Sequence, residues 1–227
     1  MSRDTWKILK QMSMEESINQ VEVELAMQCA PLITGMKISN LFSIGLDDYK
    51  AMYDILENSG ISVYQMGLLD GRVLFLLYQE NQLTSYLSRK DVAELLTRFG
   101  YDNVTPDCIL DTCRRRYQKY MLEKKDFPHE LGLILGYPPE DVEGFVSQQG
   151  KNSLYTGYWK VYKDTEAKKA LFDRFEYAKE SLIHLLSCGI PCQDSRYVFF
   201  LWYLQFLGFL LRFSVYICSS IYRMKLC

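Results

Sequence analysis

The sequence lacks a surplus of charge of either sign. Its 227 residues carry 26 Lys and Arg against 28 Asp and Glu, which gives a formal net charge of −2. A chain so close to neutrality has no general attraction for nucleic acid or for an anionic membrane surface. The composition therefore excludes a binding mode that depends on overall charge.

Paired cysteine motifs and a secretory signal are also lacking. The chain has seven cysteines, an odd number, and none of them forms a CxxC pair. Residues 1–17 contain no apolar run of the kind that a signal peptide requires. Both absences favour free thiols in a reducing cytosol over a secreted disulfide framework. We therefore expect residues 1–190 to be cytoplasmic.

The sequence does contain enough apolar material for one globular domain, because 48% of its residues are hydrophobic and 24% are charged. Apolar residues recur at three- and four-residue steps in residues 15–30 and 46–58, which predicts two helices. Pro31 should end the first helix and Gly60 the second. The buried side of the second helix should consist of Leu46, Tyr49, Tyr53 and Leu56.

The apolar pattern changes to that of strands over residues 61–78. Asp70 and Gly71 lie at the centre, and this dipeptide favours the positive φ angles of a two-residue type I′ hairpin turn. Residues 73–78 are apolar on both faces, which predicts a central strand that is covered on both sides. Residues 37–44 are either a short strand or a loop.

Helices dominate the rest of the chain. The predicted helices span residues 90–99, 106–123, 128–136, 139–150 and a long segment from 165 onward. Ser88 should cap the first of them. The buried stripe of the long helix should consist of Ala167, Leu171, Phe175, Ala178, Leu182 and Leu185. Alternating aromatic residues in 156–163 indicate a further strand. The expected fold class is α+β, mainly helical, around a sheet of three or four strands that includes the 61–78 hairpin.

The predicted organisation is an N-terminal extension (1–14), one α+β domain (15–189) and a hydrophobic tail (190–227). Residues 198–218 of the tail contain a single charge, Arg212, and are long enough to span a bilayer. Their apolar side chains favour insertion by roughly 6 kcal/mol, which Arg212 offsets by up to about 3 kcal/mol. We predict a transmembrane helix over 198–218, with a buried C-terminal helix as the alternative.

Three stretches carry a family resemblance: LAMQCAPLITGMKISNLFSI (25–44), FPHELGLILGYPPEDVEGFV (127–146) and GKNSLYTGYWKVY (150–162). In these motifs the chain resembles DUF3793, a bacterial family of unknown function found mainly in anaerobic Firmicutes, over about residues 20–185. The resemblance implies no activity. The sequence departs from the family pattern at Gln28, where the pattern has a histidine, and in its hydrophobic tail.

A thiol–imidazole pair is the sharpest catalytic hypothesis. Cys29 and His129 lie in two of these stretches, and a nucleophilic cysteine needs a nearby base to hold it as thiolate. Cys29 would supply the sulfur, His129 the base and Glu130 the orienting carboxylate. Against this, Cys29 lies on the apolar stripe of its own helix, where a structural thiol is the commoner outcome. His129 can likewise serve only to fix the start of a helix.

A metal or haem site is a second hypothesis, with Cys29, His129, Cys108 and Cys113 as candidate ligands. The spacing of Cys108 and Cys113 does not match a zinc knuckle, which has two to four residues between cysteines. Positions five apart on a helix also point away from each other. The sequence therefore assigns no metal and identifies no cofactor.

Tyr158 and Trp159 are candidate ligand-binding residues, because an indole beside a lysine can stack on the ring of a ligand. The alternative is that both rings only pack in a strand.

Nucleic-acid binding has one apparent signal, the run Arg114 to Arg116. Three consecutive arginines spread around a helix, so solvated surface with one ion pair is the expected role. The segment 139–150 could be the second helix of a helix-turn-helix, but Glu140 and Asp141 at its start would repel phosphates. We expect no sequence-specific DNA binding.

The sequence favours a non-catalytic binding or scaffold domain with an unidentified protein or small-molecule partner. Contact with the cytoplasmic membrane would come from residues 198–218. The alternatives are a cysteine-dependent enzyme and a metal- or haem-binding protein. The leading hypothesis rests on the fact that no catalytic constellation is complete.

Overall fold

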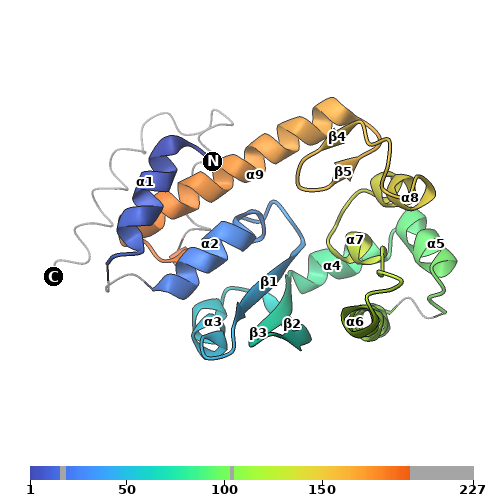
Figure 1. Ribbon diagram of the computed structural model, residues 1–227, viewed down its shortest axis with the longest axis horizontal. Helices are drawn as coiled ribbons and strands as arrows, with labels where there is room; N and C mark the ends of the chain where they lie inside the picture. Colours follow the sequence, from blue (N-terminus) through green and yellow to red (C-terminus); the bar gives the residue numbers. More distant parts are fainter. Residues whose placement is uncertain (16–18, 103–104, 195–227) are drawn as a thin grey trace.

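A computed structural model describes residues 1–15, 19–102 and 105–194 of the chain (Figure 1). This part consists of helices and antiparallel strands, which confirms the α+β class. The helices are α1 Arg3–Met12, α2 Gln20–Ile33, α3 Tyr49–Leu56, α4 Glu80–Leu87, α5 Lys90–Arg98, α6 Pro106–Glu123, α7 Leu131–Ile134, α8 Pro139–Ser147 and α9 Thr165–Ser187. The strands are β1 Ser39–Gly45, β2 Ser62–Leu69, β3 Arg72–Tyr78, β4 Tyr155–Thr156 and β5 Lys160–Val161.

The main sheet has three antiparallel strands in the order β1-β3-β2. Its hairpin turn lies at Asp70 and Gly71, whose φ angles of 51° and 74° are those that a type I′ turn requires. The predicted hairpin and the central position of β3 are therefore confirmed. Residues 37–44, predicted as strand or loop, contribute most of β1.

Strand β3 separates two hydrophobic cores. Val73, Phe75 and Leu77 belong to the first core, together with residues of α2, α3 and α9. Leu74 and Leu76 face the opposite way, toward a second core built from α4 to α8. Figure 1 shows α2 and α3 on one side of the sheet and α4, α6 and α7 on the other. The period-two alternation of β3 thus decides which helices lie on which side.

Glutamine side chains pair with backbone groups on both outer strands of the sheet. The amide of Gln28 in α2 donates to the carbonyl oxygen of Ser43 at 3.3 Å and accepts from its N–H at 3.2 Å. The amide of Gln118 in α6 donates to the carbonyl oxygen of Met66 at 3.0 Å. Such contacts satisfy backbone groups that an edge strand would otherwise offer to another chain.

The segment 156–163 does not join the main sheet, contrary to the prediction of a further strand there. It contributes to β4 and β5, strands of two residues each, which pair with each other in a separate sheet. The aromatic alternation has another cause. Tyr158 and Trp159 pack with Phe172 and Phe175 of α9 in a small third core.

Pro31 does not end its helix, as was predicted, but lies inside α2, which continues to Ile33. Proline removes one helix hydrogen bond, and this loss is tolerated here because the helix is close to its end. The carbonyl oxygen of Pro31 then accepts from the amides of Met36 and Lys37 at 2.7 and 2.8 Å. These bonds cap the helix and reverse the chain toward β1.

Helix α3 buries a different face from the predicted one. Its buried residues are Met52, Ile55 and Leu56. Tyr49 and Tyr53 are each 45% exposed, and Leu46, which lies before the helix, is 47% exposed. The prediction started the helix three residues too early and took the tyrosines as part of the buried stripe, whereas packing buries the neighbouring face. Only Leu56 was placed correctly.

Two further helix details differ from prediction. Helix α4 was not predicted, and Ser88 belongs to its end, because the Ser88 hydroxyl donates to the carbonyl oxygen of Thr84 at 2.8 Å. Arg89 occupies the position before α5, which Ser88 was expected to cap. The buried residues of α9 are Phe172, Phe175, Ala178, Leu182, Ile183 and Leu186. Phe175, Ala178 and Leu182 of the predicted stripe are thus confirmed, whereas Ala167, Leu171 and Leu185 are not buried.

The tail beyond residue 194, including the predicted span 198–218, lies outside the described residues. Within the ranges 1–15, 19–102 and 105–194, none of the helices has the length and apolar character needed to cross a membrane. Residues 1–14, predicted as an extension, contain α1, which packs against α9.

Two glycines with positive φ offer a matched test of close packing. Gly136 has a φ of 72°, and a Cβ added there would lie 2.7 Å from Cγ1 of Ile38. Gly35 has a φ of 77° and no atom within 4 Å of the same position. We expect Gly136→Ala to lower the free energy of unfolding by about 2–4 kcal/mol, because strain and overlap add.

Gly35→Ala is the control and should cost only about 1 kcal/mol, the expense of the backbone conformation alone. Urea unfolding followed by circular dichroism measures both losses. Equal losses for the two variants would contradict the role of the Gly136–Ile38 contact.

Candidate functional site

Cys29 lies in the first core and is fully buried. Its sulfur is 3.5 Å from the side-chain nitrogen of Asn40, which donates to it, and 3.9 Å from the carbonyl oxygen of Leu41. Burial raises the pKa of the Cys29 thiol to about 12. The thiol is therefore neutral at physiological pH, whereas a cysteine nucleophile requires a depressed pKa.

Lys37 shares the amide of Asn40 with Cys29. Its ammonium group donates to the side-chain oxygen of Asn40 at 2.8 Å and lies 5.4 Å from the ring centre of Tyr137. The residue is only 9% exposed, and burial lowers the pKa of Lys37 to about 8. None of the salt bridges among the described residues gives Lys37 a carboxylate partner. Lys37 is thus a buried amine that the fold holds at an energetic cost.

His129 and Glu130 have different partners from those predicted. The His129 ring lies between Phe127 and Phe145, with ring centres 5.4 and 5.1 Å away. Glu130 is 3% exposed and accepts from Arg116 at 2.6 Å and from the hydroxyl of Tyr101 at 3.2 Å. The carboxylate is therefore the buried partner of an ion pair whose arginine is partly exposed. The Cys29, His129 and Glu130 constellation stays a prediction, which the burial and pKa of Cys29 disfavour.

Each arginine of the run in α6 has a carboxylate partner, which is more than the single ion pair predicted. Arg116 joins Glu130 and also donates to the carbonyl oxygen of Phe99 at 2.9 Å. Arg114 and Arg115 both pair with Asp111. The run stabilises α6 and its contact with the end of α5, and so its charges are largely balanced within the domain.

Trp159, a predicted ligand-binding residue, is packed by protein rings on its face and at its edge. It stacks on Tyr137 at a centroid distance of 4.7 Å and meets Phe172 edge-on at 4.5 Å. Its ring nitrogen donates to Asp141 at 2.8 Å. The hydroxyl of Tyr158 donates to Glu176 at 2.7 Å. Both side chains thus have structural partners, and ligand binding by them stays a prediction.

Asp141 connects α8 to the β4–β5 hairpin and was not singled out by the sequence. It is 2% exposed and accepts from three donors: the ring nitrogen of Trp159 and the amides of Tyr162 and Lys163, at 2.8, 2.7 and 3.3 Å. It also lies in the first turn of α8, where a carboxylate is favoured by the helix dipole. This connecting role is visible only in the structure, where α8 and the β4–β5 hairpin lie side by side.

The candidate metal ligands do not gather into a site. Cys108 is exposed and Cys113 is buried in the second core. In the part of the chain that the structure describes, no group of three or more His, Cys, Asp or Glu side chains could hold a metal ion. The described residues therefore offer no coordination chemistry on which a function could be argued.

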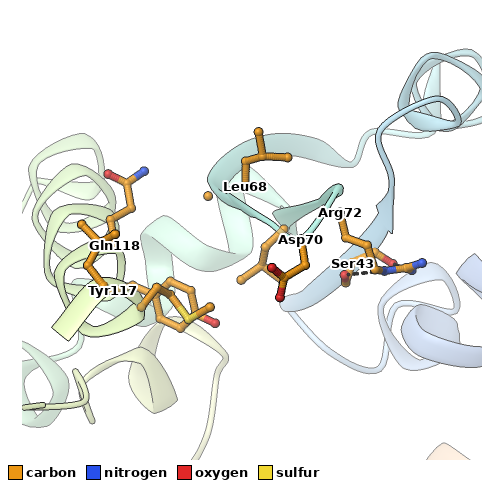
Figure 2. A pocket seen from close by; sticks show the side chains of 10 residues that line it. Ser43, Leu68, Asp70, Arg72, Tyr117 and Gln118 are labelled. Carbon is orange, nitrogen blue, oxygen red and sulfur yellow. Dashed lines mark hydrogen bonds between the residues drawn. The ribbon is translucent and has the colours of Figure 1, made fainter. Parts of the chain in front are cut away.

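A groove of about 520 Å³ lies between the turn of the β2–β3 hairpin and the C-terminal half of α6 (Figure 2). Its apolar lining consists of Leu68, Leu74, Tyr117, Met121 and Leu122, and its polar lining of Ser43, Asp70, Arg72 and Gln118, with Gly67 between them. Leu68 is 57% exposed and Leu122 is 86% exposed. The volume is typical of binding clefts.

The groove follows from small residues on the second face of the sheet. Gly67 and Ser43 lie opposite Leu74 on the two neighbouring strands, so one row across the sheet holds a single large side chain. A β-bulge between Gln65 and Gly67 interrupts β2 at the same place. Helix α6 approaches there, because Gln118 reaches within 3.9 Å of the site where a Cβ of Gly67 would lie. Because the small side chains in this row do not fill the space, a groove remains beside the contact between Gln118 and Gly67.

The groove was not predicted from the sequence. One sign of it was Leu122, an apolar residue that follows Met121 in the mainly polar segment 118–125. A second signal was Gly67 within an apolar strand, which often marks a bulge or a close approach. Neither signal identifies which surfaces face each other, since α6 and β2 are far apart in the sequence.

The chain belongs to the family described as "Protein of unknown function (DUF3793)", whose profile matches residues 25–194. This confirms the resemblance found in the sequence motifs. No curated protein and no solved structure matches the chain. The family has no known function, so it assigns no chemistry to the stretches that carry the resemblance.

Replacement of Asp141 should destabilise the domain. In Asp141→Asn one of the two carboxylate oxygens is replaced by an NH2 group, which can only donate. This group then faces another N–H donor, either the ring nitrogen of Trp159 or a backbone amide. An unsatisfied buried group of this kind costs about 2–3 kcal/mol. Glu140→Gln, at the more exposed neighbour paired with Lys168, should cost less than about 1 kcal/mol. Chemical denaturation compares the two, and a loss as large in Glu140→Gln would contradict a special role of Asp141.

Lys37 should make stability depend on pH. The folded pKa of about 8 lies below the ordinary value of 10.5, so the unfolded chain binds more protons between these values. Stability contributed by this group therefore rises with pH from about 8 to 10.5, and the cost is fully present below pH 8. Lys37→Met should be more stable than wild type at pH 7 by about 1–3 kcal/mol.

The advantage of Lys37→Met should shrink as the pH rises from 7 to about 9.5. The difference between variant and wild type isolates Lys37, because all other titrating groups are common to both. Lys168→Met, at a lysine that pairs with Glu140 at 3.2 Å, is the control. A constant Lys37→Met advantage across this pH range would show that Lys37 is charged in the folded state throughout.

Proposed function

We propose that this DUF3793 chain is a non-catalytic binding domain and that the groove between the β2–β3 hairpin and α6 is its binding surface. The observation that carries the proposal is the solvated Leu122, which is 86% exposed and lines the groove with Tyr117 and Met121 of the same helix. Single exposed leucines are ordinary on protein surfaces. One that continues an apolar wall and lines a cavity together with Leu74 of the sheet is typical of an interaction site.

Covering Leu122 would stabilise a complex. Full burial of one leucine side chain contributes roughly 1.5–3 kcal/mol, and the exposed fraction of 86% leaves most of that contribution available. Met121 supports the same role, because its flexible thioether adapts to different partner shapes. Tyr117 adds a ring at the base of the α6 wall, as Figure 2 shows.

The polar rim can fix the orientation of a bound group. Arg72 donates to the hydroxyl of Ser43 at 3.1 Å and to its carbonyl oxygen at 2.7 Å, so it is held in place at one end. Gln118 is held by Met66. Polar groups that are held in place around an apolar surface favour specific over nonspecific binding.

Catalysis is less well supported. The one catalytic hypothesis required an accessible Cys29 thiolate, and burial of Cys29 disfavours it. Membrane contact through residues 198–218 stays a prediction from the sequence, and the groove proposal does not depend on it.

The proposal is tested with Nile red, a neutral dye that fluoresces in apolar clefts. We expect full-length wild type to bind the dye and Leu122→Asp to bind it about fivefold more weakly, because one groove wall becomes charged. Leu154→Asp is the matched control, since Leu154 is 65% exposed but lies outside the groove. Contributions from the rest of the chain are the same in all three proteins.

Unchanged urea unfolding of both variants would confirm that the substitutions act on the surface alone. Equal dye binding by Leu122→Asp and wild type, or an equal loss in Leu154→Asp, would overturn the groove as the apolar binding surface.

A further inference from the structure

The groove contains two charged side chains, and they differ in whether they are paired. Arg72 forms an ion pair with Glu24 at 3.2 Å in addition to its bonds with Ser43. Figure 2 shows its guanidinium turned away from α6 and toward Ser43. Its charge is therefore balanced inside the domain, so Arg72 contributes little net attraction for an anion.

Asp70 is the charge in the groove that lacks a partner. No ion pair or hydrogen bond of its carboxylate occurs within the described part of the chain. Figure 2 places Asp70 at the hairpin turn, between Arg72 and the α6 wall. An apolar groove with one unpaired carboxylate at its edge is complementary to an apolar surface with one cation.

Lysines near the end of α6 do not balance this carboxylate. Lys119 pairs with Glu123 at 4.0 Å, and Lys124 lies 5.9 Å from the ring centre of Tyr120. Neither residue lines the groove. Of the two charged residues that line the groove, Arg72 is thus paired with Glu24 and Asp70 is the one without a partner among the described residues.

We propose that the occupant of the groove is a protein segment that presents leucine-like side chains beside a lysine or arginine, with Asp70 as the ionic partner. This inference rests on the proposed function, because it names the kind of partner that the same groove binds. The apolar side chains would cover Leu122 and Met121 on the α6 wall, and the cation would lie at the hairpin turn.

Asp70 also has a structural role, which the test must separate from binding. Its φ of 51° is that of a type I′ turn, and asparagine suits this turn at least as well as aspartate. Asp70→Asn therefore removes the charge and keeps the turn. Asp173→Asn, at an exposed aspartate of α9 outside the groove, is the control with the same change in net charge.

The probes are two fluorescently labelled amphipathic peptides of about 14 residues, roughly four helical turns, one of leucine and lysine and one of leucine and glutamate. Fluorescence anisotropy with the full-length protein at low salt measures both affinities. We expect the lysine peptide to bind wild type about fivefold more tightly than the glutamate peptide, and Asp70→Asn to reduce this ratio to about 2 or less. Asp173→Asn should leave the ratio unchanged.

Two failures are distinguishable. If Leu122→Asp weakens both peptides but Asp70→Asn does not change their ratio, the groove binds apolar segments and the assignment of a cationic partner is overturned. If Leu122→Asp weakens neither, the proposed function fails as well. Self-association of wild type that Leu122→Asp abolishes would assign the groove to a second copy of the chain and overturn the proposal.

Discussion

Burial of both faces of β3 is the constraint on which the rest of the structure depends. A strand with Phe75 on one face and Leu76 on the other cannot leave either face in water. Helices α2 and α9 therefore cover one face, and helices α4 to α8 cover the other. The chain order follows from this need, since the helices between β3 and β5 serve the second face and α9 returns to the first.

The stretches that carry the family resemblance contribute to this arrangement of helices on both faces of the sheet. Glu130 and Asp141 are buried carboxylates, and each joins segments that are separate in the sequence: α6 with the start of α7, and α8 with the β4–β5 hairpin. A buried carboxylate is stable only when its oxygens accept hydrogen bonds, so these residues require their donors in place. Glu130, which looked chemically distinctive along the chain, therefore has structural partners in Arg116 and Tyr101. The same holds for Trp159, whose ring nitrogen is one of those donors.

The hairpin, the central strand and helix α6 could be predicted because their signals are local. An Asp-Gly turn and an apolar run on both faces specify β3 without knowledge of its neighbours. The face of α3 and the position of Pro31 within α2 could not be predicted, because tertiary packing decides both. The partners of Glu130 and Asp141, and the row of Gly67 and Ser43 beside Leu74, depend on register and on contacts between segments far apart in the sequence.

The groove is an exception to the burial of apolar side chains seen in the rest of the sheet. Every other large residue of β3 between Val73 and Leu77 is buried, yet Leu74 is half-buried and Leu122, which lines the same groove, remains in solvent. A larger residue at Gly67 or Ser43 would fill the hollow, so the small residues preserve an apolar surface that costs stability in the free domain. Natural sequences keep such violations mainly where function needs them. The small residues beside the hairpin turn and α6, rather than any reactive group, are therefore the basis for proposing that a partner binds there.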